Sequence, residues 1–170
     1  MDPVTLQVML AALRGVAEEM EAALIRTAYS PNIKERRDCS TALFDDEGRM
    51  AVQSASIPVH LGAMPEAVAA MIEAGVGPDE VWAVNDPYRG GTHLPDLTLV
   101  APLVIGGAIA GYSVSRAHHA DIGGMSPGSM PAGSRELLQE GLVIPPVPLV
   151  RGGRTDDALM SMILANTRAP

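Results

Sequence analysis

Three of the four histidines of this chain lie in one stretch, over residues 85–124, that also holds several aspartates. His93 and Asp96 stand in the pattern HLPD, and the pair His118-His119 follows later in the same stretch. Imidazole nitrogens and carboxylate oxygens are common metal ligands, and histidine also moves protons near neutral pH. Gathering so many of these side chains in one stretch indicates a functional centre rather than packing alone.

The ligand set that this pattern offers is His93, Asp96 and one of the two adjacent histidines. Two imidazoles and one carboxylate form a metal site with open positions, suited to Fe(II), Mn(II) or Zn(II). Because neighbouring side chains in an extended segment point to opposite sides, only one of the two histidines is needed, and we take His118 as the ligand. His119 and Asp121 are then predicted to be catalytic residues. His119 is free for proton transfer or for a hydrogen bond to a ligand, and Asp121 is a candidate for the carboxylate that orients it. The alternative is a hydrogen-bonded His–Asp group with a structural role.

Two residues outside this stretch also carry reactive side chains. His60 stands just before a predicted helix, where it is either a catalytic or anion-binding group at the positive helix end or a loop histidine. We include it among the predicted catalytic residues. Cys39 is predicted to be a small core residue, because its neighbours follow a strand pattern and no histidine is close in sequence.

The predicted metal ligands meet only if the chain between them folds back on itself. Residues 97–105 are apolar, 106–107 are Gly-Gly, and 108–116 alternate as a second strand, which together predict an antiparallel hairpin. The two ends of an antiparallel pair lie side by side, so the hairpin brings His93 and Asp96 next to His118. A second hairpin is predicted over residues 40–54.

Helices are predicted to flank these hairpins. One begins at Pro3 with Asp2 as its cap, one covers residues 65–74, and one follows Thr155 as its cap. Residues 32–38 are interpreted as a solvated connection, and residues 142–150 as an extended edge segment at best, because prolines interrupt them. The predicted fold is one α+β domain over residues 1–170, with antiparallel β-hairpins packed against flanking helices.

Composition narrows the class of protein. A hydrophobic share of 47% and a charged share of 19% are typical of a globular chain, and the formal net charge of −8 argues against nucleic acid as a partner. No apolar run is long enough to cross a bilayer, and the one cysteine has no partner for an internal disulfide. A cytoplasmic protein is expected. An ending at Pro170 predicts that the chain is the first part of a longer protein or one piece of a split chain.

Five segments of the chain, in order, resemble the hydantoinase B family. They are ERRDCSTALFDDEG, IPVHLGAMP, NDPYRGGTHLPD, SRAHHADIGGMSPGSMP and QEGLVIPPV. The family includes the B subunit of N-methylhydantoinases, the corresponding part of 5-oxoprolinases and the alpha subunit of acetone carboxylase. The resemblance covers essentially the whole chain but only the N-terminal portion of such a subunit.

The resemblance implies an activity and a partner. A hydantoinase A-like ATPase subunit uses ATP to activate the substrate, and the B-type subunit then opens a cyclic amide of the hydantoin or 5-oxoproline type, as part of a hetero-oligomer. The acetone carboxylase relative has a manganese site whose ligands match His93, Asp96 and His118. Two alternatives remain open: a component of an acetone carboxylase-like ketone carboxylase, and a non-catalytic truncated or split fragment that binds metal.

Overall fold

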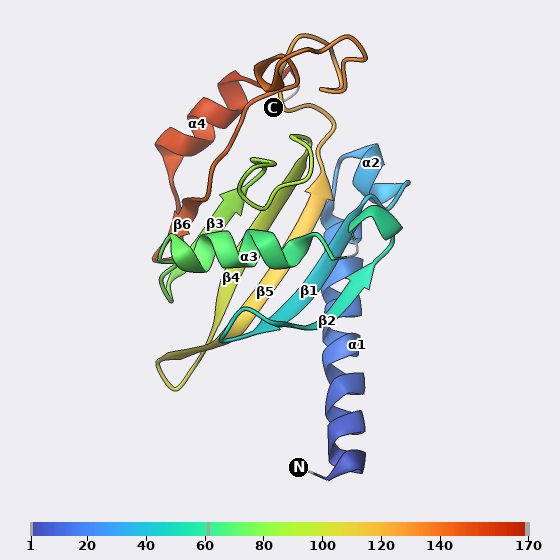
Figure 1. Cartoon of the computed structure of the whole chain (residues 1–170), viewed down its shortest axis with the longest axis vertical. Helices are drawn as coiled ribbons and strands as arrows, with labels where there is room; N and C mark the ends of the chain where they lie inside the picture. Colours follow the sequence, from blue (N-terminus) through green and yellow to red (C-terminus); the bar gives the residue numbers. More distant parts are fainter. Residues whose placement is uncertain (1, 61, 169–170) are drawn as a thin grey trace.

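The centre of the molecule is one antiparallel sheet. A computed structural model describes residues 2–60 and 62–168 of the chain (Figure 1). The sheet has seven strands in the spatial order β2-β1-β5-β4-β3-β6-β7. The strands are β1 (Cys39–Asp45), β2 (Met50–Ala55), β3 (Glu80–Val84), β4 (Asp96–Ile105), β5 (Ala108–His118), β6 (Val147–Arg151) and β7 (Arg154–Thr155).

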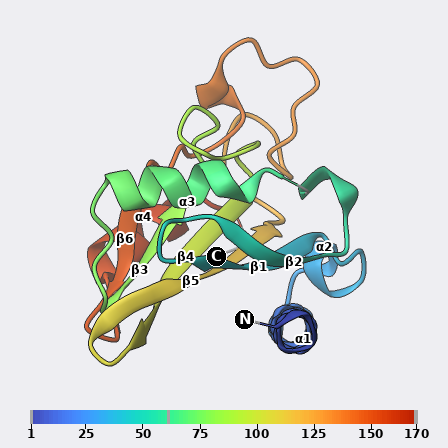
Figure 2. The same ribbon diagram turned by 60° about the horizontal axis from the view of Figure 1, so that its bottom comes forward.

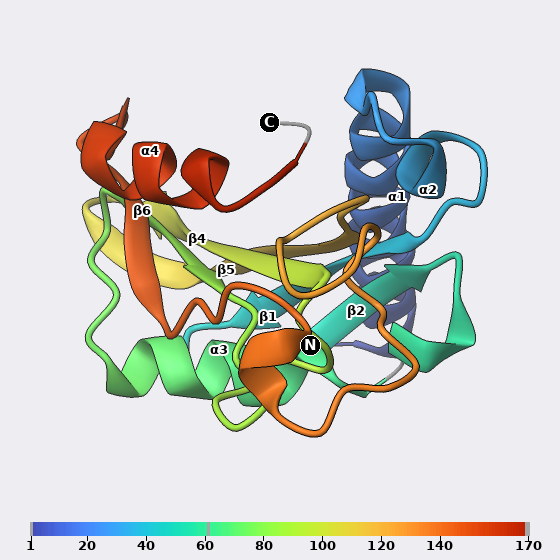
Figure 3. The same cartoon turned by 90° about the horizontal axis from the view of Figure 1, so that it is seen from above.

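Helices cover both faces of this sheet. They are α1 (Pro3–Thr27), α2 (Pro31–Lys34), α3 (Met64–Glu73) and α4 (Asp157–Ala165), with short 3-10 turns η1 (Pro58–His60) and η2 (Leu137–Gln139). Figures 2 and 3 show α3 on one face of the sheet and α1 and α4 on the other. Antiparallel strands with helices on both faces confirm the predicted α+β class. Among the described residues, no helix combines the length and apolarity that a membrane span requires.

Helix α1 begins where the sequence predicts. The Asp2 carboxylate accepts hydrogen bonds from the backbone N–H groups of Val4 and Thr5, and Pro3 needs no such partner. Further along, Ala17 is fully buried against Leu43 and Val52 of the β1/β2 hairpin. The first turns extend beyond the sheet (Figure 1). The helix is therefore held mainly through its C-terminal half.

Both predicted hairpins are present. Gly48 and the Gly106-Gly107 pair have positive φ angles at the two turns, a conformation that costs glycine little. In the β4/β5 hairpin, Asp96 is directly opposite His118. At the end away from the turn, β4 begins one residue earlier and β5 ends two residues later than predicted. Asp96 and His118 therefore belong to the paired strands rather than to the flanking loops.

Strand alternation places the main core between the sheet and α3. Inward-facing strand residues such as Ala42, Val100 and Val114 pack with Met64 and Met71 of the helix. All five side chains are nearly inaccessible to solvent. This core rigidly supports the same face of the sheet near Asp96 and His118, where the buried residues become polar.

Two details differ from the sequence prediction. Strand β6 is not an edge, because it pairs with β3 on one side and with β7 on the other. The pairing of β3 with β6 shifts its register between Val81 and Trp82. Pro148, opposite Trp82, is tolerated next to this irregularity. Helix α4 is capped by Asp156 rather than Thr155, since the Asp156 carboxylate accepts the N–H of Leu159.

The position of Cys39 predicts an unreactive thiol. Burial, reinforced by the negative charges of Glu21 and Asp38, raises the pKa of this thiol to about 11. At pH 8 the thiolate fraction is then roughly 100-fold below that of an ordinary cysteine. Alkylation by iodoacetamide, followed by mass spectrometry, should be at least this much slower in the folded protein than in urea. Equal rates would contradict the burial of Cys39.

Candidate metal centre

The face that packs against α3 becomes polar at one end of the sheet. The strand residues there continue the same alternation as the core, so their side chains point to the same side as α3. They are Ser40 of β1, Asp96 and Thr98 of β4, and Arg116 and His118 of β5. All of them are buried. A set of buried polar groups next to a packed core has to be satisfied internally, and its contacts define the site.

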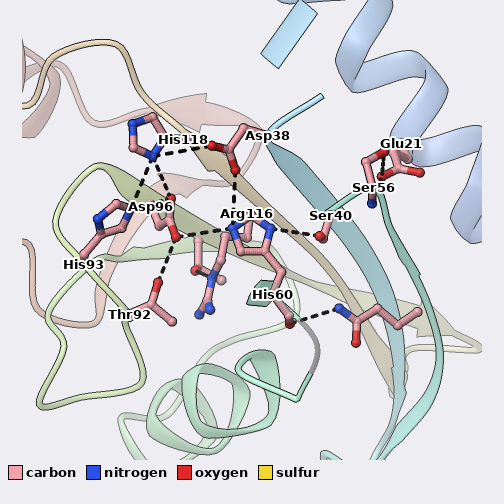
Figure 4. Close-up of polar contacts among 12 residues, drawn as sticks. Glu21, Asp38, Ser40, Ser56, His60, Thr92, His93, Asp96, Arg116 and His118 are labelled. Atoms are coloured by element: carbon pink, nitrogen blue, oxygen red, sulfur yellow. Dashed lines mark hydrogen bonds and ion pairs between the residues drawn. The ribbon is translucent and has the colours of Figure 1, made fainter. Parts of the chain in front are cut away.

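Asp96 is at the centre of these contacts (Figure 4). Its Oδ1 is 3.0 Å from Nε2 of His93 and 3.2 Å from Nδ1 of His118. The two imidazole nitrogens are themselves 3.2 Å apart. The structure therefore brings together the three residues that the sequence predicts as metal ligands.

The other carboxylate oxygen of Asp96 faces a different set of groups. Thr92 donates its hydroxyl to Oδ2 at 2.9 Å, and Nε2 of His60 is 3.3 Å from the same oxygen. On its far side, Nδ1 of His60 is 2.9 Å from the hydroxyl of Ser40. His60, which the sequence left open between a site residue and a loop residue, is fully buried in this network.

Asp38 is a fifth member that the sequence analysis missed. Its Oδ2 is 3.8 Å from Nδ1 of His118, and its Oδ1 is 3.7 Å from Nε2 of His60. The backbone explains its position, because the N–H of His118 donates to the carbonyl of Asp38. We refer to Asp38, His60, His93, Asp96 and His118 as the His–Asp cluster.

The protonation of the cluster follows from its contacts. Burial alone would raise the pKa of Asp96, but hydrogen bonds from His118, His60 and His93 outweigh it and hold that pKa far below its usual range. The hydrogen bond to Asp96 in turn raises the pKa of His93. Asp96 is therefore a carboxylate at any physiological pH, as a metal ligand must be.

The geometry of the cluster fits a divalent metal ion. Ligand bonds of about 2.0–2.2 Å place neighbouring ligand atoms roughly 3–3.5 Å apart. The nitrogen and oxygen atoms of His93, Asp96 and His118 are separated by 3.0–3.2 Å. Asp38 adds a second carboxylate next to His118. Two imidazoles with carboxylates suit zinc, iron or manganese.

The two remaining predicted catalytic residues differ in their positions. His119 follows His118, one of the predicted ligands, and is half-buried, and burial lowers its pKa, so its imidazole is neutral at physiological pH. Asp121 turns away into a loop. Its carboxylate accepts the N–H of Gly123 at 2.9 Å and pairs with Nη1 of Arg168, also at 2.9 Å. The structure does not bring Asp121 into the His–Asp cluster.

A buried arginine supports the loop that carries His93. Arg116 donates from Nε to the Thr98 hydroxyl at 2.7 Å and from Nη2 to the carbonyl of Gly90 at 2.9 Å. Burial lowers the pKa of Arg116, although the negative charge of Asp96 opposes this effect. Its positive charge beneath the cluster offsets part of the charge of the two aspartates.

Asn85 connects the start of the same loop to a distant segment. Its fully buried amide donates to the carbonyls of Leu94 and Leu142, and its oxygen accepts the N–H of Ile144. Asn85→Ala would leave all three backbone groups without this partner. We expect the free energy of unfolding to fall by about 2–3 kcal/mol, measured by urea denaturation.

Asn166 offers a matched control for this substitution. It is exposed, and among residues 2–60 and 62–168 its side-chain amide bonds only to the carbonyl of Met162 in the preceding helical turn. Asn166→Ala should change the free energy of unfolding by no more than about 0.5 kcal/mol. Equal effects of the two substitutions would show that Asn85 does not hold the loop.

Comparison with known families decides which family this chain is part of. Residues 2–170 match the family model described as hydantoinase B/oxoprolinase. The chain belongs to this family. The 5-oxoprolinase of Dictyostelium discoideum is 39% identical over 172 residues, which is 99% of this chain and 14% of that protein. The beta subunit of the caprolactamase of Pseudomonas jessenii is 34% identical over 171 residues, 99% of this chain and 29% of that subunit.

Solved structures show the same fold for this hydantoinase B/oxoprolinase chain. The crystal structure of the ATP-dependent caprolactamase from Pseudomonas jessenii superposes with a TM-score of 0.86 at 32% identity, over 99% of this chain and 30% of that one. A nucleotide-free acetone carboxylase superposes with a TM-score of 0.90 at 22% identity, over 98% and 23%. At that identity the second likeness shows the fold alone. The chain spans less than a third of the length of each of these relatives.

Proposed function

We propose that this chain is the metal-holding part of an ATP-dependent hydrolase that opens a cyclic amide of the hydantoin or 5-oxoproline type. The observation that carries the proposal is the convergence of His93, Asp96 and His118 within 3.2 Å of one another, in a family that includes 5-oxoprolinase. A hydantoinase A-like ATPase subunit would activate the substrate, and the complex would be cytoplasmic. The two-subunit arrangement is supported by the name of the caprolactamase relative, a beta subunit.

Three residues hold the ion in this proposal, and Asp38 is close enough to serve as a further ligand. When bound, a divalent cation polarises a carbonyl oxygen and activates a water molecule, which is the chemistry that amide hydrolysis needs. The donor set favours zinc, iron or manganese. Asp96 and Asp38 supply the negative charge that retains the cation at this end of the sheet.

Ring opening also requires one proton transfer. In the amide phosphorylated by the partner, water adds its oxygen to the carbonyl carbon and the C–N bond breaks as a proton passes to the ring nitrogen; a second water then releases phosphate from the acyl group. His119 is the candidate for this transfer, because its imidazole is within reach of the charges of His118 and Asp96 and burial keeps it neutral. Asp121 has the separate task of holding its loop through Arg168.

The test is an assay of the full protein together with its ATPase partner. Hydantoin, 5-oxoproline and caprolactam are offered with ATP, and the ring-opened amino acids are measured by mass spectrometry. We expect ring opening that requires ATP, the partner and His118, with His118→Ala inactive. Glu73→Ala, which changes an acidic residue of α3 outside the cluster, is the matched control and should retain activity.

Two other results would replace this proposal. Incorporation of bicarbonate into acetone, with no ring opening, would identify the ketone carboxylase alternative. Stoichiometric metal without either activity would identify a non-catalytic metal-binding fragment. Full ring opening by His118→Ala would contradict the role of the cluster.

A further inference from the structure

His60 differs from the other histidines of the cluster in where its ring is held. It ends the 3-10 turn η1 just before α3, and its side chain is about 1% exposed, whereas that of His93 is 41% exposed. Both ring nitrogens have partners: Nδ1 meets the Ser40 hydroxyl at 2.9 Å and Nε2 meets Oδ2 of Asp96 at 3.3 Å. The ring therefore lies between a neutral hydroxyl and a carboxylate (Figure 4).

The direction of these hydrogen bonds follows from the protons available. Ser40 is fully buried, and within the described part of the chain its hydroxyl has one hydrogen-bond partner, Nδ1 of His60. A buried hydroxyl that lacks an acceptor is costly, so Ser40 donates to Nδ1. Nε2 then carries the ring proton and donates it to Asp96. This direction also suits Asp96, because a carboxylate can only accept.

The two oxygens of Asp96 are consequently divided between two tasks. Oδ2 accepts from Thr92 and His60, while Oδ1 faces the nitrogens of His93 and His118. We propose that Ser40 and His60 form a positioning relay that holds Oδ2 away from the metal ion, so that Asp96 binds it through Oδ1 alone. This inference rests on the metal of the proposed function and adds a role that the family assignment does not contain.

Binding through one oxygen has a chemical consequence. A carboxylate that binds through both oxygens occupies two coordination positions, whereas one oxygen leaves a position for water or substrate, as catalytic sites require. Nε2 of His60 is also 3.7 Å from Oδ1 of Asp38, so the same N–H group faces both carboxylates of the cluster. His60 is thus a positioning residue and not a group that touches the substrate.

The first test reads the proton on the ring directly. In ¹⁵N-labelled, zinc-loaded protein, two-bond nitrogen–proton correlations distinguish a ring protonated on Nε2 from one protonated on Nδ1. We expect the proton of His60 on Nε2. A bare Nε2, or a second zinc ion per chain that is lost in His60→Leu, would overturn the relay and make His60 a ligand.

The second test uses cobalt(II), whose visible absorption reports its coordination number. His60→Leu fills the buried position with an apolar side chain of similar size and removes the N–H donor. His60→Gln retains an N–H group near the position of Nε2. We expect His60→Leu to change the intensity of the cobalt bands and to weaken cobalt binding by about 10- to 100-fold. His60→Gln should restore most of both. Failure of rescue by Gln would contradict a hydrogen-bonding role.

Gln53→Leu is the matched control. The Gln53 amide donates at 3.1 Å to the backbone carbonyl of His60, so its loss loosens the same turn without changing a contact of the ring. We expect the wild-type cobalt spectrum in this variant. If Gln53→Leu changed the cobalt spectrum as much as His60→Leu does, His60 would only support the turn, and the proposed relay would be wrong.

Failure of the relay and failure of the proposed function give different results. Neither cobalt binding nor the ring proton depends on ATP, a partner or a substrate. A protein that passes both tests but opens no ring contradicts only the hydrolase. A protein that binds cobalt normally in His60→Leu contradicts only the relay. Absence of cobalt in the wild type would contradict the metal on which the proposed function depends.

Discussion

Asp96→Asn is expected to abolish stoichiometric metal binding and to lower ATP-dependent ring opening at least about 1000-fold. The substitution keeps the shape of the side chain but removes the negative charge that faces His93 and His118 at 3.0 and 3.2 Å. A metal ion contributes several kcal/mol of transition-state stabilisation, and about 4 kcal/mol corresponds to the stated factor. Elemental analysis of the purified protein measures the metal, and the ring-opening assay measures the rate.

Asp121→Asn is the control for this prediction. Asp121 was predicted from sequence as part of the site, but its carboxylate pairs with Arg168 outside the cluster. The variant should retain its metal, and circular dichroism of both variants should show the wild-type fold. Stoichiometric metal in Asp96→Asn would remove Asp96 from the ligand set, whatever the activity of the variant.

The convergence of His93, Asp96 and His118 was accessible to sequence analysis because a single hairpin brings its two ends together. An apolar strand, a Gly-Gly turn and an alternating strand predict that the two ends of the hairpin meet, but counting outward from the pair Ile105 and Ala108 would place Asp96 opposite Ala117. An irregularity between Leu103 and Val104 shifts the register by one residue, and Asp96 is therefore opposite His118. A local signal was therefore enough to bring two distant residues together.

Asp38 and Ser40 could not be found in this way. They reach the cluster because β1 pairs with β5, with Ser40 opposite Arg116, and nothing in the sequence around either strand specifies that pairing. The charges of residues 32–38 also favoured a solvated connection, which α2 and the loop after it largely are. Asp38 is brought to the cluster by the hydrogen bond that the N–H of His118, at the end of β5, donates to its carbonyl.

Asp121 shows the opposite limitation. It is close in sequence to His118, and the sequence analysis therefore placed it in the site. The chain leaves the sheet after His118, and Asp121 lies in the loop beyond the strand, where its carboxylate accepts the N–H groups of Gly123 and Gly128. Arg168, far away in sequence, then provides the partner of the carboxylate. Short separation along the chain does not ensure contact once a strand has ended.

Gly91→Ala is expected to lower the free energy of unfolding by about 4 kcal/mol or more. A Cβ at this position would lie 2.7 Å from the carbonyl oxygen of Asp86 and closer still to that of Asn85. These are backbone atoms of a tight loop, and the N–H of Gly91 already donates to the carbonyl of Asp86 at 2.8 Å. Relief would require the loop to open, which overpacking of this kind makes costly. Urea denaturation measures the change.

The loop must keep this shape because it leads directly into the proposed metal site. Thr92 and His93 follow Gly91, and both contact Asp96, so an opened loop would withdraw one donor and one ligand together. We therefore expect Gly91→Ala to weaken zinc binding even where the protein is still folded. Gly15→Ala makes the same substitution inside α1, where a Cβ would meet nothing within 4 Å, and should stabilise the protein by about 0.5–1 kcal/mol. A neutral Gly91→Ala would mean that the loop adapts, and that backbone packing at Gly91 does not determine the position of His93.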